Sequence, residues 1–412
     1  MIKHKLVVLS LVLIISIPSL LSDFSVSSSY PASGSSDIAN SEIPESHLIE
    51  GVPYVSQETG FYCPYASSTM IFKYYGINTS LHEVLYNSGI GYSLIYINHG
   101  FIDSYQISQT PGERSFLATL YGLSYQIWYP DTSTVPDEEC WQEYWTRTKQ
   151  NISKDIPVTT SVDPYSLPYL RKKYNITDNE THYGHAIVLV GFNETNATVC
   201  YNDPAAGLWN DEVNGTYIYI SKEILKNVVQ NTTATKYLIE TFTNQSDSPP
   251  SPKNKRFEKA HERNIQKMKG KLEVYSDLRL PLFPKLGIKA VEAFKKDLRI
   301  GITRRMATVF LYGITDYQQL INVYLPIAIE KYNASQYLLE NENLSSICKH
   351  DASLLQKESN CWENMTIFAL DLSYILKNNG FLKSLIKSIV ITQKMKKTLN
   401  EIISIERAII SG

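Results

Sequence analysis

Short runs of apolar residues, separated by turn-forming residues, characterise the first part of the chain. They predict strands over residues 52–55, 124–129, 157–162, 186–192, 198–201 and 217–220, and helices over residues 64–75, 115–121 and 141–152. Pro64 suits a first helical turn, where its missing N–H has no partner, and Gly76 suits a left-handed cap. An early helix followed by a late antiparallel sheet predicts an α+β fold.

Beyond a Pro- and Ser-rich linker at residues 244–256, apolar residues recur at three- and four-residue spacings. Residues 288–298, 317–339 and 382–410 follow this spacing, with few strand or hairpin signals, which predicts an all-α domain over residues 257–412. The predicted organisation is thus a signal peptide at 1–22, a Ser-rich disordered leader at 23–48, an α+β domain at 49–243, the linker and the helical domain.

The amino end has the pattern of an export signal. Lys3, His4 and Lys5 precede an apolar run over residues 6–21, and a Ser-rich polar segment follows it. An uncleaved anchor is the alternative, but the run is shorter than the ~20 residues that span a bilayer and contains Pro18. We therefore expect the chain to be extracytoplasmic, either secreted or associated with the cell surface.

Asn-X-Ser/Thr sequons agree with export, although a chain rich in Asn and Thr also produces them by chance. The twelve sequons lie at Asn78, Asn151, Asn175, Asn179, Asn193, Asn196, Asn214, Asn231, Asn244, Asn333, Asn343 and Asn364.

Composition describes a soluble globular protein whose two parts differ in charge. Hydrophobic residues make up 43% and charged residues 19%, which excludes a disordered chain. A net charge of −2 excludes a strongly basic nucleic-acid binder, and we expect no nucleic-acid partner. Residues 1–247 carry −12, however, and residues 248–412 carry +10. The Lys/Arg-rich run at 253–271 is either a solvated helix face or a surface that binds acidic groups, which would let the helical domain dock on the acidic one.

Five cysteines leave at least one thiol unpaired within the chain. A nucleophilic Cys needs a lowered pKa, and the positive end of a helix together with a nearby imidazole provides this. Cys63 begins the helix predicted after Gly60. Gln57 precedes it by six residues, so its side-chain amide can join the Cys63 backbone N–H in holding the oxyanion that forms when a thiolate attacks a carbonyl. One such donor typically contributes about 10²–10³ in rate.

The base that this chemistry requires is a His facing the helix, oriented by a carboxylate or an amide. His185 opens the most apolar strand, and Asp203 lies eighteen residues later, after a return strand that should end beside it. Asn202 is the competing orienting residue. His182 is a less suitable base because it lies farther from the strand.

The segments VPYVSQETGFYCPYASSTMIFKYYG, GHAIVLVGFN and VCYNDPAAG resemble papain-like cysteine peptidases, and among them the bacteriocin-processing (double-glycine leader) peptidases and their exported relatives. The family motifs, a Gln, a Cys opening a helix, a His opening a strand and an Asp-Pro ending the next strand, match Gln57, Cys63, His185 and Asp203. The resemblance covers about residues 50–240 and implies a papain-like fold. It departs at Pro64, where the family usually has Gly or Ala.

Each of these residues also has a structural alternative. Cys63 could be half of a disulfide, Gln57 a solvated loop residue, His185 a packed strand-end histidine, and Asp203 an ordinary turn residue before Pro204. Parity and export suggest instead that the other four cysteines pair as Cys140–Cys200 and Cys348–Cys361. No third ligand accompanies His182 and His185, and no phosphate-cradling glycine pattern occurs, so we expect neither a metal nor a cofactor.

Three functions follow from this constellation. The first is an exported cysteine peptidase that cleaves a peptide or protein substrate, with Cys63 as nucleophile, His185 as base and then acid, Asp203 as orienter and Gln57 as oxyanion donor. The second is an acyltransferase with the same thioester chemistry, because a papain-like domain followed by helices also resembles the butirosin-type acyltransferases. The third is an inactive papain-like binding module that offers its Tyr-rich loops as contact surface.

Overall fold

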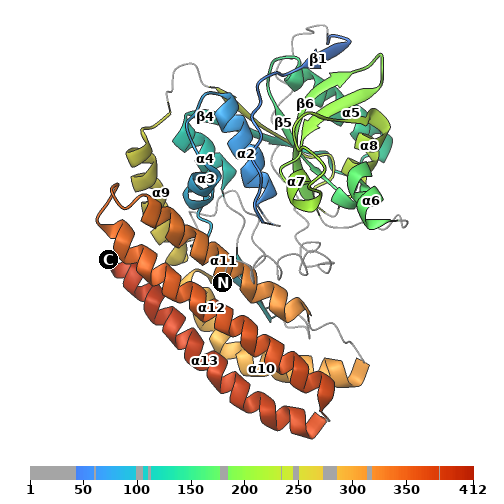
Figure 1. Ribbon diagram of the computed structural model, residues 1–412. Coiled ribbons are helices and arrows are strands. Elements are labelled where there is room, and N and C mark those ends of the chain that lie inside the picture. The colour runs from blue at the N-terminus through green and yellow to red at the C-terminus, as the bar shows by residue number, and fades with distance from the viewer. Residues whose placement is uncertain are drawn as a thin grey trace. The chain divides into compact units, whose positions relative to one another are not determined.

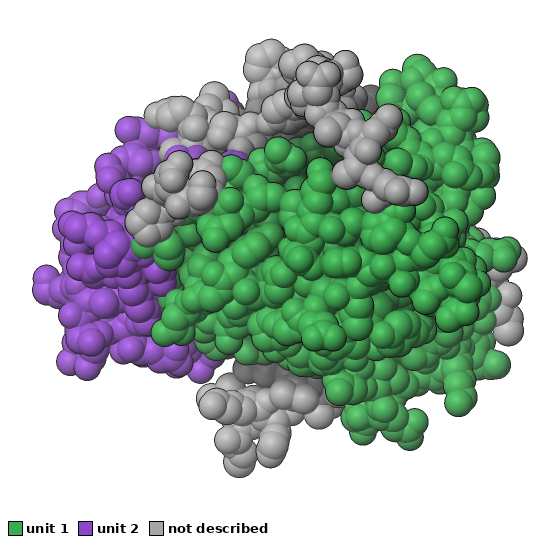
Figure 2. All heavy atoms as spheres, turned by 90° about the horizontal axis from the view of Figure 1, so that it is seen from above, with its two compact units in different colours: residues 1–84, 121–250 green, residues 85–120, 251–412 purple. Residues whose placement is uncertain are grey.

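A computed structural model provides the structure, which describes residues 43–59, 62–98, 105–109, 113–176, 184–232, 234–244, 250–271, 285–312, 318–379 and 381–412. The predicted signal peptide and most of the predicted leader lie outside these ranges. The chain forms two compact units (Figure 2): the first comprises residues 1–84 and 121–250, the second residues 85–120 and 251–412. Residues 85–120 thus group with the helical unit, whereas the sequence pattern assigned them to the first domain.

The first unit is built on one antiparallel sheet, which confirms the α+β expectation. Its strands follow the order β4-β9-β5-β6-β7-β8, and β1 also pairs with β6. These strands are β1 (Ser46–Leu48), β4 (Leu123–Trp128), β5 (Val158–Val162), β6 (His185–Asn193), β7 (Thr198–Asn202), β8 (Ile218–Ser221) and β9 (Ile239–Asn244). The helical elements are α2 (Cys63–Tyr74), α3 (Leu81–Ser88), α5 (Asp137–Ile152), η1 (Pro164–Ser166), α6 (Pro168–Tyr174), α7 (Ala206–Trp209) and α8 (Lys222–Gln230). Helix α3 leads into the second unit.

Strand β6 is the centre of the first unit. Every residue from His185 to Phe192 is buried, so both faces of the strand are covered. Helix α2 contacts β5 and β6, while α5 contacts the same strands and α8 contacts β5. In Figure 1, α2 lies on one side of these strands and α5 and α8 on the other.

Helix α2 begins and ends where Pro64 and Gly76 predict. Pro64 occupies the first turn, and Gly76 has a φ of +77° directly after the helix. The Gly76 N–H donates to the Lys73 carbonyl and the Ile77 N–H to the Phe72 carbonyl, which satisfies two carbonyls of the last turn. The sequence therefore fixes the position of Cys63 as the first residue of this helix.

The strand predicted over residues 52–55 is wrong. This segment joins no sheet, and its backbone bonds to a side chain instead: the Val52 N–H donates to the Tyr217 hydroxyl at 3.1 Å. The same hydroxyl donates to the Ile49 carbonyl. Tyr217 thereby fixes the segment from Ile49 to Val52, which leads to Gln57.

The second unit consists of long helices and a small sheet. Three of the helices confirm the predicted ones, whereas α12 and the sheet β10-β2-β3 were not predicted. The elements are β2 (Leu94–Asn98), β3 (Tyr105–Gln109), α4 (Arg114–Tyr121), α9 (Lys253–Met268), β10 (Lys285–Leu286), α10 (Ile288–Tyr312), α11 (Gln318–Glu340), α12 (Ile347–Asn378) and α13 (Phe381–Ser411). None of the helices in the described ranges has the length and apolar character needed to cross a membrane.

The basic run at 253–271 forms helix α9, and two of its cations bind an acidic residue of the same unit. Arg263 bonds to Glu113 at 2.5 Å, and the buried Lys267 lies 3.5 Å from the same carboxylate. The Lys267 ammonium also donates to the Ser88 carbonyl at 2.6 Å. Part of this run is therefore neither solvated nor free for another surface.

Both predicted disulfides are wrong, because all five cysteines are free and buried. Cys348 and Cys361 lie on the single helix α12, where thirteen residues span ~20 Å, far beyond the ~7 Å limit for bridged Cα atoms. Cys140 lies on α5, with its thiol against the Val135 carbonyl, and Cys200 lies on β7. The prediction used only the odd number of cysteines and the predicted export, and neither of these indicates how far apart two cysteines lie.

The free cysteines predict how the protein responds to redox conditions. Unfolded without a reductant, it should react with five equivalents of a thiol dye, and a reductant should leave its Tm unchanged, because no bridge constrains the unfolded chain. Differential scanning calorimetry with and without dithiothreitol measures the second point. A single reactive thiol, together with a lower Tm in dithiothreitol, would contradict the free state of the other four.

Candidate active site

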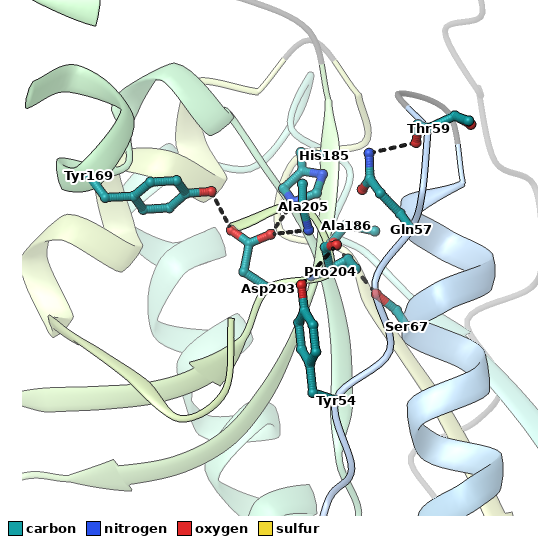
Figure 3. Close-up of polar contacts among 10 residues, drawn as sticks. All are labelled: Tyr54, Gln57, Thr59, Ser67, Tyr169, His185, Ala186, Asp203, Pro204 and Ala205. Atoms are coloured by element: carbon teal, nitrogen blue, oxygen red, sulfur yellow. Dashed lines mark hydrogen bonds and ion pairs between the residues drawn. The ribbon is translucent and has the colours of Figure 1, made fainter. Parts of the chain in front are cut away.

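Cys63 lies at the amino end of α2, with its side chain only 9% exposed. N–H groups of a first helical turn have no acceptor within the helix, so the Cys63 amide is available for a ligand. The Ser67 hydroxyl, one turn later, lies 3.5 Å from the Ala186 carbonyl and joins α2 to the start of β6 (Figure 3). The thiol is therefore held beside the first residues of β6.

His185 and Asp203 meet because β6 and β7 are antiparallel. His185 begins β6, and Asn202 ends β7 opposite Val188, so Asp203 follows at the edge where β6 starts. The His185 Nε2 lies 2.8 Å from an Asp203 carboxylate oxygen, Oδ1. Both residues are buried, His185 at 2% and Asp203 at 0% exposure.

Three further bonds fix Asp203. The Ala205 N–H donates to Oδ1 at 2.9 Å, and the Tyr169 hydroxyl donates to Oδ2 at 2.8 Å, so the carboxylate lies between Tyr169 and His185 (Figure 3). The Asp203 N–H donates to the Gly215 carbonyl. A Cβ on Gly215 would lie 2.5 Å from the Asp203 carbonyl oxygen, so this approach requires glycine.

A small apolar cluster covers this carboxylate. Leu170, Ala205 and Trp209 are buried together, and Tyr169 packs against them. The Trp209 ring lies 4.6 Å from the His185 ring, at 55° between the planes. Water is thus excluded from the imidazole, which strengthens its interaction with Asp203.

The electrostatics of His185 connect Asp203 with Cys63. Burial by itself lowers the pKa of the imidazole, but the charges of Asp203 and Cys63, and a hydrogen bond with each, outweigh it and raise the pKa of His185 to about 10. Since Nε2 faces Asp203, Nδ1 is the ring nitrogen left for Cys63. Burial, and next the charge of Asp203, raise the pKa of Tyr169 well above its usual value, so this phenol remains a donor.

Gln57 is fully buried in the loop before α2. Its backbone N–H donates to the Pro204 carbonyl at 2.9 Å, which ties this loop to the turn that carries Asp203. The side-chain nitrogen donates to the Thr59 carbonyl at 2.8 Å (Figure 3). A carboxamide nitrogen carries two N–H donors, so one remains for another acceptor.

The two competing residues have other surroundings. Asn202 is not the orienter: its side chain donates to the Val52 carbonyl and accepts from the Tyr217 N–H at 2.7 Å. His182 lies outside the described residues. The structure therefore joins His185, Asp203 and Cys63 by direct interactions and places Gln57 in the loop bonded to the Asp203 turn.

Sequence reasoning missed Tyr169 and Trp209. Trp209 could have been suspected, because it follows Asp203 by six residues and lies two residues beyond the segment assigned to the site. Tyr169 carries no comparable signal, since the chain separates it from Asp203 by thirty-four residues. Within the described residues, no group of three His, Cys, Asp or Glu side chains could hold a metal ion.

Comparison with known proteins agrees with this geometry. Residues 49–238 match the Peptidase_C39 like family, over the stretch that holds all four predicted site residues. No match was found among the curated proteins. The narrower likeness to the bacteriocin-processing peptidases stays a prediction. The match over residues 49–238 is consistent with a papain-like cysteine peptidase domain in this part of the chain.

Proposed function

We propose that the protein is an exported thiol hydrolase that cleaves peptide or amide bonds through Cys63, His185, Asp203 and Gln57. The observation that carries the proposal is the buried imidazole, bonded to a carboxylate at 2.8 Å and interacting with a thiol at a helix start. A histidine with a purely structural role does not need both a carboxylate and a thiol as partners. Perturbed groups of this kind concentrate at functional sites.

In the proposed first step, the Cys63 sulfur attacks the substrate carbonyl carbon, and the carbonyl π electrons move to the oxygen. The Cys63 N–H and the remaining Gln57 N–H donate to that oxyanion. When the carbonyl re-forms, the C–N bond breaks and the His185 imidazolium gives its proton to the departing amine, leaving a thioester on Cys63. His185 then takes a proton from a water molecule as the water oxygen attacks the thioester carbonyl, and the C–S bond breaks to release the acid and restore the Cys63 thiolate beside the His185 imidazolium.

Asp203 serves this cycle without changing its own protonation. Its carboxylate orients the imidazole by the Nε2 bond and stabilises the imidazolium. Tyr169 and the Ala205 N–H hold the carboxylate in place. Transfer of the acyl group to an amine would use the same residues, so the product identifies the acceptor. A binding module would not need the ordered His185–Asp203 pair.

Export is part of the proposal. It rests on the apolar run at 6–21 and on the sequons, because no sequon asparagine is buried within the described ranges. The exposed ones are Asn78, Asn175, Asn196, Asn214, Asn244, Asn343 and Asn364. Docking of the basic part of the chain on the acidic part also remains a proposal, and it requires that salt weaken the contact.

Replacing the nucleophile tests the reaction itself. Cys63→Ala should lower turnover of a peptide library by about 10⁴-fold or more, because the thioester can no longer form. Mass spectrometry of the library measures cleavage, and circular dichroism checks the fold. Cys140→Ala, at another buried free cysteine, is the matched control and should retain activity. Cleavage by Cys63→Ala at the native rate would contradict the assignment.

Tyr169→Phe tests how the carboxylate is held. We expect kcat/KM to fall about tenfold, since one of the bonds to Asp203 is lost and the imidazole is less firmly oriented. The pH dependence of kcat/KM should shift as well, which lost packing alone would not cause. Tyr174→Phe, on the exposed part of the same helix, serves as the control. Equal rates and pH profiles for all three proteins would show that Tyr169 does not act through Asp203.

The raised pKa of His185 predicts a loss of stability as pH rises. The folded imidazole keeps its proton up to about pH 10, whereas the unfolded one loses it near its ordinary pKa of about 6.5. The contribution is complete below that pKa and declines above it, by roughly 1 kcal/mol per pH unit. Urea unfolding of the Cys63→Ala protein at pH 6.5 and 8 measures the slope, because in the native chain a proton lost from the Cys63 thiol on folding would offset the proton held by His185.

Asp203→Asn is the comparison for this slope, because it removes a charge that holds the proton on His185. Its free energy of unfolding should depend less on pH over the same interval. An identical slope in the variant would mean that the Asp203–His185 pair does not hold the proton.

A further inference from the structure

Large apolar side chains are exposed at one end of the second unit. Three lie on the last turns of α12 and three on the first turns of α13, namely Ile367, Leu370, Tyr374, Ile386, Ile389 and Val390. Their exposure is between 42% for Leu370 and 69% for Tyr374. We call these six residues the apolar end face.

The six residues form one face because of their spacing and of the turn that joins the helices. On α12 they follow an i, i+3, i+7 pattern whose i+4 position is the exposed Asp371, and on α13 an i, i+3, i+4 pattern, so each set forms a stripe. The helices contact each other and are joined directly after Asn379, so the end of α12 lies beside the start of α13 (Figure 1). Farther from this turn the exposed positions become polar, as at Asn360, Asn364 and Ser404.

Several buried positions on the first turns of α13 are polar, unlike the usual pattern of a solvated helix, although Leu372 and Leu376 of α12 and Ile391 of α13 are buried apolar residues of the same turns. Ser384, Ser388 and Thr392 are at most 6% exposed. Their hydroxyls donate to backbone carbonyls, for example Ser384 to Ile375 at 3.2 Å and Thr392 to Ser388 at 2.7 Å. Small residues inside and large aliphatic residues outside are typical of helices whose outer face contacts lipid.

Lysines border the apolar end face. Residues 381–397 contain five lysines and no acidic residue. Lys383, Lys387 and Lys394 are exposed, and the Lys394 ammonium lies 5.9 Å from the centre of the Phe368 ring on α12. Exposed aliphatic residues flanked by lysines are the pattern of a helix that lies in a membrane interface, with the chains of the lysines reaching to the headgroups.

We propose that the apolar end face binds the surface of a membrane that contains anionic lipids. Charge decides between this partner and a second copy of the chain, because a symmetric contact would bring the same lysine-rich segment of each copy to one interface. Anionic headgroups instead neutralise these lysines, at about 1 kcal/mol for each cation near the surface. The aliphatic side chains then enter the boundary between headgroups and acyl chains. The proposal is independent of the peptidase reaction.

Vesicle sedimentation of the full chain tests the proposal. The protein should sediment with vesicles made of equal parts phosphatidylcholine and phosphatidylglycerol, and at least tenfold less with phosphatidylcholine alone. Ile386→Gln/Ile389→Gln/Val390→Gln should reduce binding to the anionic vesicles by at least tenfold, and Lys383→Gln/Lys387→Gln should reduce it and weaken its salt dependence. All five positions are exposed or half-exposed, so the fold should persist.

A matched control uses two exposed polar positions of the same helix, Gln393→Asn and Ser404→Gln, which should bind as the native chain does. Light scattering measures the oligomeric state of each protein without vesicles. The proposal is overturned if the native chain binds neither vesicle. It is also overturned if the apolar variant binds normally, or if the native chain forms a dimer that the apolar variant abolishes while vesicle binding is absent.

Discussion

A buried carboxylate must have all of its hydrogen bonds satisfied, and Asp203 is the residue on which the site depends. Its charge is fully removed from water, which is costly unless partners surround it. His185, Ala205 and Tyr169 supply those partners, and Gly215 permits the close approach that holds the backbone. The same bonds that make Asp203 tolerable in the interior also fix the orientation of the imidazole.

From this constraint follows the distinction among the five thiols. Burial raises the pKa of Cys140 and Cys348, that of Cys200 to about 11 and that of Cys361 to about 12, so these four remain inert thiols. Cys63 instead interacts with the His185 imidazole, whose proton is held by the Asp203 carboxylate. The odd number of cysteines suggested that Cys63 is the one unpaired thiol, but the other four cysteines are free as well.

The sequence could predict what depends on local signals. Pro64 and Gly76 mark both ends of α2, and the apolar run after His185 marks the strand, so Cys63 and His185 could be located. The return strand after a turn brings Asp203 to His185, which a hairpin pattern also implies. Contacts between distant segments decide the role of Tyr169, the free state of the cysteines and the sheet β10-β2-β3. No local sequence pattern encodes such contacts. The burial of Ser384 and Ser388 on α13 could not be predicted either, because periodicity alone does not indicate which stripe of a helix faces inward.

The central claim is that the imidazole activates Cys63, and alkylation of the native protein tests it most directly. Iodoacetamide at neutral pH, followed by mass spectrometry of the peptides, gives the rate at each cysteine. The account predicts that Cys63 is labelled much faster than the other four and that His185→Ala slows this labelling to their level. Equal labelling of Cys63 with and without His185, or no labelling of Cys63 in the reduced native protein, would contradict it.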